Sequence, residues 1–380
     1  MRIAHIVPSF WPARAYGGAV ESTYWLCRYL AKQGCRVRVL TTDADGASRL
    51  DVVTTREVER ERVRIRYCPR MMRQSVSLPY VRLLPGYVRW ADVVHLTGVY
   101  SFPTIPTLLV CRMLRKPLVW SLRGALQQWP GSRRRAAKRV WNTVCRAARP
   151  AHIVAHVTSE QEGQESLLRF PGISLVVIPN GVEIPDAVPR SRADRTLRLL
   201  YLGRLDPKKG LENLLAACRL VDQAGMDWML TVAGGGDARY VDRVRGLVGE
   251  LGLDEKVKMV GLVFGDAKED LFARSDVVVV PSHTENFGLV VAEALARRVP
   301  VIAARGTPWS RLDEVGCGLW VENDPDSLAT AIRQMSGLPI RRMGEQGMEW
   351  MRREFRWEAR AREMIDCYER SLAVGHPALR

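Results

Sequence analysis

Four consecutive valines, Val277–Val280, stand between Asp276 and Pro281 in the C-terminal half of the chain. Valine is β-branched, and an uninterrupted run of such residues is typical of a strand that is buried on both faces. These strands occur inside parallel sheets, because the helices that connect parallel strands cover both faces of the sheet. The run therefore predicts an α/β domain and places residues 277–280 in the interior of its sheet.

Similar apolar runs alternate with helix-like stretches along the whole chain, in two successive series. We expect strands at 3–7, 37–40, 93–96, 118–120 and 153–157 in the first series, and at 197–202, 228–233, 257–259, 277–280 and 299–303 in the second. This alternation is typical of doubly wound parallel sheets. Prolines and charges between 179 and 195 predict a linker. The 380 residues then divide into two α/β domains, 1–185 and 186–357, with a ligand cleft at the carboxyl ends of the strands.

Two glutamates follow the valine strand at a spacing that suits a phosphate and sugar ligand. Glu285 lies in the loop after the strand, and Glu293 lies about one turn into a helix that begins near Gly288 or Leu289. The exposed backbone amides at a helix start can hold a phosphate group. Carboxylates on either side can accept hydrogen bonds from sugar hydroxyl groups. The alternative is a helix start whose acidic residues only complement the helix dipole.

Two more strand-to-helix loops belong to the same sheet edge. The loop 203–210, G-R-L-D-P-K-K-G, carries Arg204, Lys208 and Lys209, whose charges can neutralise a leaving diphosphate. The alternative for this loop is a solvated basic turn. The loop 233–237, A-G-G-G-D, is a weaker signal, because three glycines also serve any tight turn.

These motifs occur together and in a recognisable order. An E-x7-E motif at 285–293 follows G-R-L-x-x-x-K-G at 203–210 and A-G-G-G-D at 233–237. Near the N-terminus, residues 17–21 have the form G-G-x-x-E, and the segment 355–368 closes the series. In these motifs nearly the whole chain resembles the family 4 retaining glycosyltransferases of the GT-B fold.

The resemblance implies two Rossmann-like domains that face each other across a cleft, the first binding the acceptor and the second binding a nucleotide sugar. It implies that 358–380 forms a helix that crosses back towards the first domain. Arg204 and Lys209 match the pair that grips the donor diphosphate. Glu285 matches the carboxylate near the transferred sugar, and Glu293 matches the one that accepts from the ribose hydroxyls. Further donor contacts are implied for Gly17, Gly18, Gly234, Met259, Val260, Leu262, Asn286, Phe287, Gly288 and Leu289, and residues 307–309 (Thr-Pro-Trp) are expected to line the same cleft.

The acceptor side departs from the family in one place. Many relatives carry a histidine in the loop where this chain reads Ser-Leu-Arg-Gly at 121–124. We therefore take Arg123, Trp129 and His95 as candidate acceptor-side residues. For His95 the alternative is a structural histidine at a strand end, and the other histidines are interpreted as structural or incidental.

The net charge of +16 is concentrated in one part of the chain. Residues 62–159 contain 18 Lys and Arg but one acidic residue, Asp92. A basic helix is expected at 133–145, with Val140, Trp141 and Val144 between the charges, a pattern that suits an anionic membrane surface. The alternative is a solvated basic face. Nucleic-acid binding is disfavoured, because no recognised nucleic-acid motif accompanies the charge.

The sequence offers no reason to expect a metal or another cofactor. The D-x-D motif at 43–45 lies away from the donor motifs, and the eight cysteines include no C-x-x-C pair. Scattered cysteines fit a reduced cytosolic chain. The N-terminus has no signal-peptide pattern, and no apolar run approaches the 18 residues of a membrane-spanning helix.

We therefore expect a metal-independent retaining hexosyltransferase that uses a nucleotide diphosphate sugar as co-substrate. The expected acceptor is a hydroxyl of a saccharide, carried by undecaprenyl diphosphate, in bacterial exopolysaccharide or lipopolysaccharide assembly. Such an enzyme would be cytoplasmic and peripheral on the inner face of the membrane. The alternatives are a nucleotide-sugar epimerase or a phosphorylase on the same two-domain plan, or a non-catalytic protein that binds polyanions or lipid.

Overall fold

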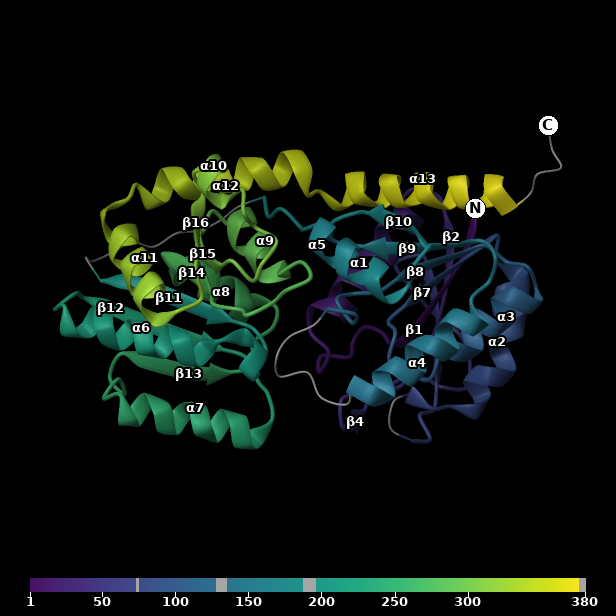
Figure 1. Cartoon of the computed structure of the whole chain (residues 1–380), viewed down its shortest axis with the longest axis horizontal. Helices are drawn as coiled ribbons and strands as arrows, with labels where there is room; N and C mark the ends of the chain where they lie inside the picture. Colours follow the sequence, from purple (N-terminus) through teal and green to yellow (C-terminus); the bar gives the residue numbers. More distant parts are fainter. Residues whose placement is uncertain (73–74, 128–134, 187–195, 376–380) are drawn as a thin grey trace. The chain divides into compact units, whose positions relative to one another are not determined.

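The computed structural model describes residues 1–72, 75–127, 135–186 and 196–375. The chain forms two compact units, and each is described by itself. The first contains Met1–Gly181 and the segment that begins at Trp357, and the second contains Val182–Arg356 (Figure 1).

The first unit is built on an eight-stranded sheet in the order β10-β9-β8-β7-β1-β2-β6-β5. Its strands are β1 (Arg2–Ser9), β2 (Arg36–Thr42), β5 (Val58–Arg60), β6 (Val63–Cys68), β7 (Val93–Thr97), β8 (Leu118–Ser121), β9 (Ile153–Val157) and β10 (Ser174–Val177). All neighbours are parallel except β5 and β6, which are antiparallel. A separate hairpin joins β3 (Ala44–Asp45) to β4 (Ser48–Arg49).

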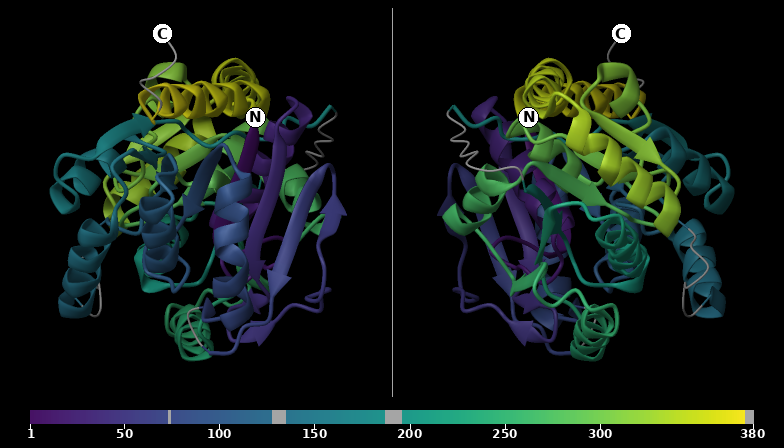
Figure 2. Two further views of the ribbon diagram at one scale, coloured as in Figure 1. Left: turned by 90° about the vertical axis from the view of Figure 1, so that its right-hand side faces the viewer. Right: turned by 90° about the vertical axis from the view of Figure 1, so that its left-hand side faces the viewer.

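Helices cover both faces of this sheet (Figure 2). The core on one face includes residues from α2 (Leu78–Trp90), α3 (Thr104–Met113) and α4 (Arg135–Ala148). The core on the other face includes residues from α1 (Gly18–Lys32) and α13 (Trp357–Gly375). Helix α5 (Glu160–Arg169) packs beside β9 and β10. The C-terminal helix is therefore an integral part of the first unit.

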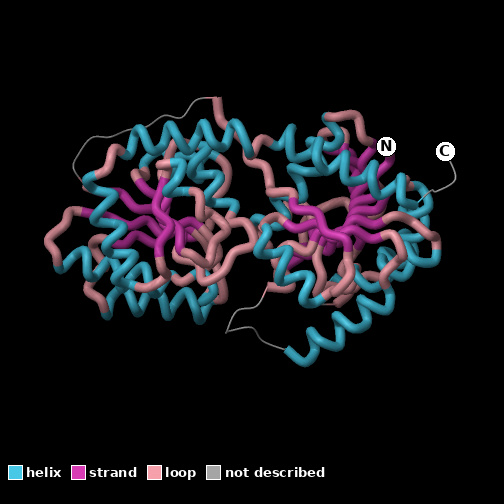
Figure 3. The backbone as a smooth tube through the Cα atoms, turned by 45° about the horizontal axis from the view of Figure 1, so that its top comes forward, coloured by secondary structure: helices cyan, strands magenta, loops and turns pink. Residues whose placement is uncertain are grey.

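The second unit has a six-stranded sheet in the order β13-β12-β11-β14-β15-β16, and all of its neighbours are parallel. Its strands are β11 (Leu197–Leu202), β12 (Trp228–Ala233), β13 (Val257–Gly261), β14 (Val277–Val280), β15 (Val301–Ala304) and β16 (Gly318–Val321). Helices α6 (Leu211–Gln223), α7 (Ala238–Glu250) and α11 (Pro325–Gly337) cover one face, and α8 (Asp266–Arg274), α9 (Leu289–Ala296) and α12 (Ile340–Glu354) cover the other. Figure 3 shows helices packed around the strands of each sheet. The four valines of β14 are buried between β11 and β15.

The predicted fold class is confirmed in both units. The expected strand at 299–303 begins instead at Val301, because Pro300 has no N–H to give to a strand ladder. Strand β6 was missed, because Arg64 and Arg66 interrupt its apolar residues and leave an alternating pattern of a half-buried strand. The short edge strands β10 and β16 were missed as well.

Candidate functional site

The strand order of the second unit's sheet reverses at β11, because the chain first adds strands on one side of β11 and then on the other. The candidate site lies at this switch point. Strand β12 follows β11 on one side of the sheet, whereas β14 lies on the other side. In doubly wound sheets the loops that diverge at such a switch point form the usual ligand site. Here the two loops are joined by a hydrogen bond from the His283 amide to the Lys208 carbonyl, 2.9 Å long.

The ion pair between Lys209 and Glu285 is the centre of this site. Lys209 belongs to a 3-10 turn, Pro207–Lys209, whose first amide is capped by the Asp206 carboxylate. Its ammonium contacts Glu285 Oε1. The same oxygen accepts a 3.0 Å hydrogen bond from Ser282 Oγ, and Glu285 is only 8% exposed. The structure thus brings together a lysine and a glutamate from two loops that lie 76 residues apart.

The charge of this pair is fixed by its surroundings. Burial is the largest single influence on the Glu285 carboxyl and would raise its pKa, but Lys209, Lys208 and Ser282 together outweigh it. The pKa of Glu285 is therefore below its ordinary value, and the group is a carboxylate. Burial lowers the pKa of Lys208, helped by the charges of Lys209 and Arg204 and opposed by Glu285. Arg204 itself is exposed.

Glu293 forms a second buried ion pair nearby in the fold. It lies in α9 with 8% of its surface exposed, and Lys268 from α8 donates to its Oε1 at 2.6 Å. Arg297 donates to the Glu293 carbonyl and makes a bidentate pair with Glu269, so α8 and α9 are tied together. Lys268 was not among the predicted site residues. No local pattern marks it, since its partner lies on a different helix 25 residues away.

Two glycines allow the loops of the site to approach one another. Gly234 has a φ of +144°, and a Cβ there would lie 1.8 Å from the Gly203 carbonyl oxygen. Gly210 has a φ of +64°, and its Cβ would lie 2.0 Å from the Pro281 carbonyl oxygen. Side chains at either position would collide with backbone, so these loops require glycine.

The start of α9 is the third element of the candidate site. Gly288 is in the left-handed conformation and caps the helix that begins at Leu289. The first amides of a helix have no carbonyl partner within the helix, which suits an anion. Phe287 lies just before this turn with 4% exposure, and its carbonyl accepts a 2.5 Å hydrogen bond from the indole of Trp309.

The expectation that residues 307–309 line the cleft is wrong for two of their side chains. Thr307 is 1% exposed and donates to the Ala304 carbonyl, and Trp309 is 2% exposed. Trp309 lies beneath the loop at 285–288, where it packs against Phe287 with ring centroids 5.2 Å apart.

The remaining predicted donor residues occupy positions near strand and helix ends. Met259 and Val260 are half-buried on β13, Leu262 follows that strand with 65% exposure, and Asn286 is half-buried in the loop after β14. In the first unit, Gly17 caps α1 in a positive-φ conformation and Gly18 begins that helix. Both of these glycines are exposed at the carboxyl end of β1.

The acceptor-side candidates in the first unit turn out differently. His95 is fully buried, with Nδ1 2.5 Å from the Tyr368 hydroxyl and Nε2 2.6 Å from Ser121 Oγ. Both ring nitrogens are therefore used inside the unit, and the structural alternative for this residue holds. Arg123 lies in the turn after β8, and its guanidinium donates to Asn180 Oδ1 at 2.5 Å. Trp129 lies outside the described residues.

His95 belongs to a buried chain of hydrogen bonds. The Ile178 carbonyl can only accept, so it accepts from His156 Nε2 at 2.9 Å, and His156 Nδ1 then accepts from the Ser121 hydroxyl at 2.5 Å. Ser121 in turn accepts from His95 Nε2, which leaves His95 Nδ1 to accept from Tyr368. These directions hold for neutral histidines, in which one ring nitrogen donates and the other accepts.

Burial keeps these histidines neutral. It lowers the pKa of His156 to about 3 and the pKa of His5, which stacks on His95, also to about 3, and the Arg123 charge adds to both effects. The pKa of His95 is lowered as well, by burial first and then by His5, His156 and Arg123. The network therefore acts as a structural element that joins α13 to β7, β8 and β9.

The D-x-D motif has a structural role in the first unit. Asp43 Oδ1 accepts from the Arg70 amide at 2.6 Å, and Asp45 Oδ1 accepts from the amides of Arg14 and Ala15. Throughout the part of the chain that the structure describes, no group of three or more His, Cys, Asp or Glu is placed to hold a metal ion.

Each of the two units matches the model of a known protein family. Residues 16–184 match the model described as Glycosyltransferase Family 4, and residues 187–350 match the model described as Glycosyl transferases group 1. The chain belongs to the group 1, or family 4, glycosyltransferases.

Several characterised and uncharacterised glycosyltransferases resemble the chain in sequence. An uncharacterised glycosyltransferase of Methanocaldococcus jannaschii is 32% identical over 46% of this chain and 45% of its own length. A D-inositol 3-phosphate glycosyltransferase of Kineococcus radiotolerans is 31% identical over 58% of this chain and 57% of its own. The chain thus spans about half the length of these relatives. A GDP-mannose:cellobiosyl-diphosphopolyprenol alpha-mannosyltransferase of Xanthomonas oryzae is 27% identical over 90% of this chain and 88% of its own.

Solved structures show that this glycosyltransferase has the GT-B fold. The sucrose-phosphate synthase of Thermosynechococcus elongatus matches with a TM-score of 0.77 and 25% identity, over 98% of this chain and all of its own. The Anabaena protein Alr3699/HepE, solved in complex with UDP-glucose, matches with a TM-score of 0.73 and 19% identity, over 97% and 99% of the two chains.

Proposed function

We propose that this glycosyltransferase is a retaining, metal-independent hexosyltransferase that takes its sugar from a nucleoside diphosphate sugar. The observation that carries the proposal is the buried Lys209–Glu285 pair at the switch point of the second sheet. Two relatives support the donor class: the Xanthomonas enzyme is named for GDP-mannose, and the Anabaena protein binds UDP-glucose.

In this proposal the cations and amides of the site stabilise the leaving group. The bond between the anomeric carbon and the donor diphosphate breaks, and its electron pair goes to the diphosphate. Arg204, Lys209 and the first amides of α9 then neutralise that charge, which is the main catalytic demand where no metal supplies it. Lys209 has three N–H donors, so it can contact a phosphate oxygen and Glu285 together.

The two glutamates have different proposed tasks. Glu285 is held as a carboxylate, so it can stabilise the positive charge that develops on the transferred sugar. The acceptor hydroxyl attacks on the face from which the diphosphate departs and gives its proton to the diphosphate, so the anomeric configuration is retained. Glu293 accepts from the ribose hydroxyls, with Lys268 beside it.

A ligand panel tests the donor class. Thermal unfolding is measured with UDP, GDP and ADP and with their glucose and mannose derivatives, because a ligand that binds only the native state raises the unfolding temperature. We expect one nucleoside diphosphate and its sugar to stabilise the protein. NMR of the product then reports its anomeric configuration. Absence of a shift with every nucleotide, or an inverted product, would refute the proposal.

We further propose that the acceptor is a saccharide on undecaprenyl diphosphate, used in bacterial exopolysaccharide or lipopolysaccharide assembly at the inner face of the cytoplasmic membrane. The Xanthomonas relative, which is named for a diphosphopolyprenol acceptor, supports this class. None of the helices among the described residues is long and apolar enough to cross a membrane. Any attachment through these residues must therefore use a surface.

The surface that fits is formed by α3 and α4, and we call it the α3–α4 surface. Its exposed apolar side chains are Leu109, Met113, Val140 and Val144, and its exposed basic ones are Arg112, Arg115, Arg139 and Arg146. Between residues 93 and 159 the chain has no acidic residue. Apolar groups beside uncompensated cations suit an anionic leaflet, where each cation contributes about 1 kcal/mol.

Co-sedimentation with liposomes tests this surface. We expect binding that rises with anionic lipid and falls with salt. The variant Arg139→Glu/Arg146→Glu should bind at least about thirtyfold more weakly, because loss of the two cations alone costs about 2 kcal/mol and the two new carboxylates are repelled by the anionic lipid. Arg341→Glu/Arg342→Glu makes the same charge change at exposed positions of α12 and should bind as wild type. Equal binding to neutral and anionic vesicles would refute the proposal.

A further inference from the structure

The indole of Trp309 is buried directly beneath the proposed donor loop. Its N–H donates to the carbonyl of Phe287 at 2.5 Å. That carbonyl belongs to the same planar peptide unit as the amide of Gly288. In a trans peptide the C=O and the N–H point in opposite directions. The hydrogen bond from Trp309 therefore fixes the direction of the Gly288 N–H, which points away from the indole.

Gly288 also touches the same ring. Its backbone is in the left-handed conformation, with a φ of +76°, and a Cβ at this position would lie 3.3 Å from Trp309 Nε1. The turn before α9 thus rests on the indole both through a hydrogen bond and through direct packing. A substitution that removes the indole therefore alters the orientation of the first amides of α9 through the protein itself.

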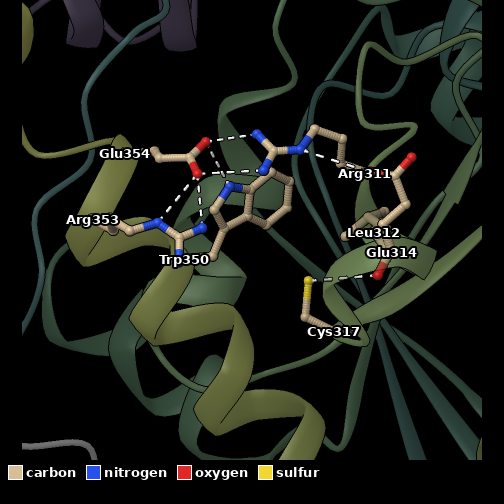
Figure 4. Close-up of polar contacts among 7 residues, drawn as sticks. All are labelled: Arg311, Leu312, Glu314, Cys317, Trp350, Arg353 and Glu354. Carbon is tan, nitrogen blue, oxygen red and sulfur yellow. Dashed lines mark hydrogen bonds and ion pairs between the residues drawn. The ribbon is translucent and has the colours of Figure 1, made fainter.

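A cluster at the end of α12 connects that helix to the segment that contains Trp309. Figure 4 shows its polar contacts among Arg311, Trp350, Arg353 and Glu354. Trp350 packs edge-to-face on Trp309 at 5.6 Å, and its own indole donates to Glu354 Oε2 at 2.9 Å. Glu354 also accepts from Arg311 at 2.7 Å and from Arg353 at 2.8 Å. Arg311 lies two residues after Trp309, so the carboxylate anchors the Trp309 segment to α12.

Glu354 keeps its charge in this cluster. Burial would raise the pKa of its carboxyl, but hydrogen bonds from Arg311, Arg353 and Trp350 outweigh burial and lower the pKa to about 2. The Arg311 guanidinium in addition lies over the Trp350 ring, 5.2 Å from its centroid. Trp350 and Arg353 lie on α12 itself, so losing the Trp350 hydrogen bond leaves the link between Glu354 and Arg311 in place.

We infer that Trp309 is a positioning residue of the donor site, which orients the Gly288 amide through the carbonyl of Phe287. Glu354 supports it by anchoring Arg311. The inference rests on the proposed function, in which the first amides of α9 face the donor diphosphate. Its structural part, the control of the Gly288 peptide by Trp309, is measurable without any ligand.

The test compares Trp309→Phe with Trp350→Phe. Each variant keeps an aromatic ring in the same cluster and loses one indole N–H, but only Trp309 donates to the loop. Hydrogen–deuterium exchange of the peptide that spans 284–292 is measured in the free protein, and the affinity for UDP and GDP is measured by calorimetry. For Trp309→Phe we expect exchange about tenfold faster and affinity about tenfold weaker, as for the loss of one hydrogen bond. Trp350→Phe should match wild type in both.

The outcomes separate the two claims. If Trp309→Phe and Trp350→Phe exchange alike, Trp309 only fills space and the inference fails. If wild type binds neither nucleotide, the proposed function fails, while the exchange rates still decide the role of Trp309. Should Trp309→Phe not fold, Glu354→Gln keeps the indole and weakens its anchor, and it must accelerate the same exchange by a smaller factor. Unchanged exchange in Glu354→Gln would then overturn the inference.

Discussion

The buried histidines of the first unit make its stability depend on pH. His5 and His156 each have a folded-state pKa of about 3, against an ordinary value of 6.5. Between pH 6.5 and pH 3 these two histidines are therefore protonated in the unfolded chain but neutral in the folded protein. The stability that these neutral histidines contribute is complete above pH 6.5, and it is lost as the pH falls from 6.5 towards 3.

The size of the effect follows from the same values. At pH 5.0 an unfolded histidine with a pKa of 6.5 is almost fully protonated, whereas a folded one with a pKa near 3 is not. Linkage then gives a loss of about 2 kcal/mol in the free energy of unfolding for each of His5 and His156 between pH 7.5 and pH 5.0. His95, whose pKa is also lowered, acts in the same direction.

The variant His156→Asn isolates one of these contributions. Its amide can still accept from Ser121 but does not titrate, so it should lose stability at pH 7.5 and yet depend less on pH. The free energy of unfolding is measured in urea at pH 7.5 and pH 5.0. We expect the loss between the two pH values to be about 2 kcal/mol smaller than in wild type.

A control separates titration from damage to the core. Val157→Ala on β9 removes fully buried methyl groups and leaves all the histidines in place. It should be less stable at both pH values by a constant amount. If His156→Asn and wild type lose the same stability on acidification, His156 is not held neutral by the fold, and the assigned direction of hydrogen bonding is wrong.

Three further expectations concern the donor site. Lys209→Ala, Glu285→Ala and Arg204→Ala should each lower turnover by about tenfold or more with folding intact, because these polar side chains lie on loops; an unchanged rate for Lys209→Ala would remove it from the diphosphate role. Glu293→Ala should raise the Kd for nucleotide more than it lowers kcat, and Lys268→Met should do the same, since ribose contacts are alike in ground and transition states. Activity should survive EDTA, and a loss that divalent ions restore would show that a metal takes part.

The sequence predicted those parts of the fold that depend on local pattern. The valines of β14 are continuous, and a single polar residue interrupts the apolar runs of β11 and β12, so all three strands could be predicted from the local pattern within a few residues. Strand β6 was missed because Arg64 and Arg66 alternate with its buried residues. This strand is recognised only from its pairing with β2, which lies more than 20 residues earlier in the chain.

The sequence predicted which residues of the donor loops belong to the site, but it did not predict which of them contact each other. Glu285 and Lys209 were both expected near a phosphate, yet nothing in their spacing indicates that they pair directly. Lys268 was missed altogether, because a lysine in an acidic stretch has the pattern of a solvated helix face. His95, for which the sequence left a structural role open, is the reverse case. A polar residue at the end of a strand suggests a ligand contact, but Tyr368, which occupies its Nδ1, comes from a helix 273 residues later.

The two crossings between the units explain why such long-range partners recur. The chain enters the second unit at Val182 and leaves it after Arg356. The Val182 amide donates to the Phe355 carbonyl at 2.7 Å, so the start and the end of the second unit lie side by side. Just beyond, in the first unit, a Cβ on Gly181 would lie 2.4 Å from the Trp357 ring. The second unit is thus inserted into the first, and α13 can return to complete the core that begins at β1. A chain cut after the second unit would leave the buried His95 without its hydrogen bond to Tyr368 and would therefore be less stable. The sequence around either residue does not indicate this dependence.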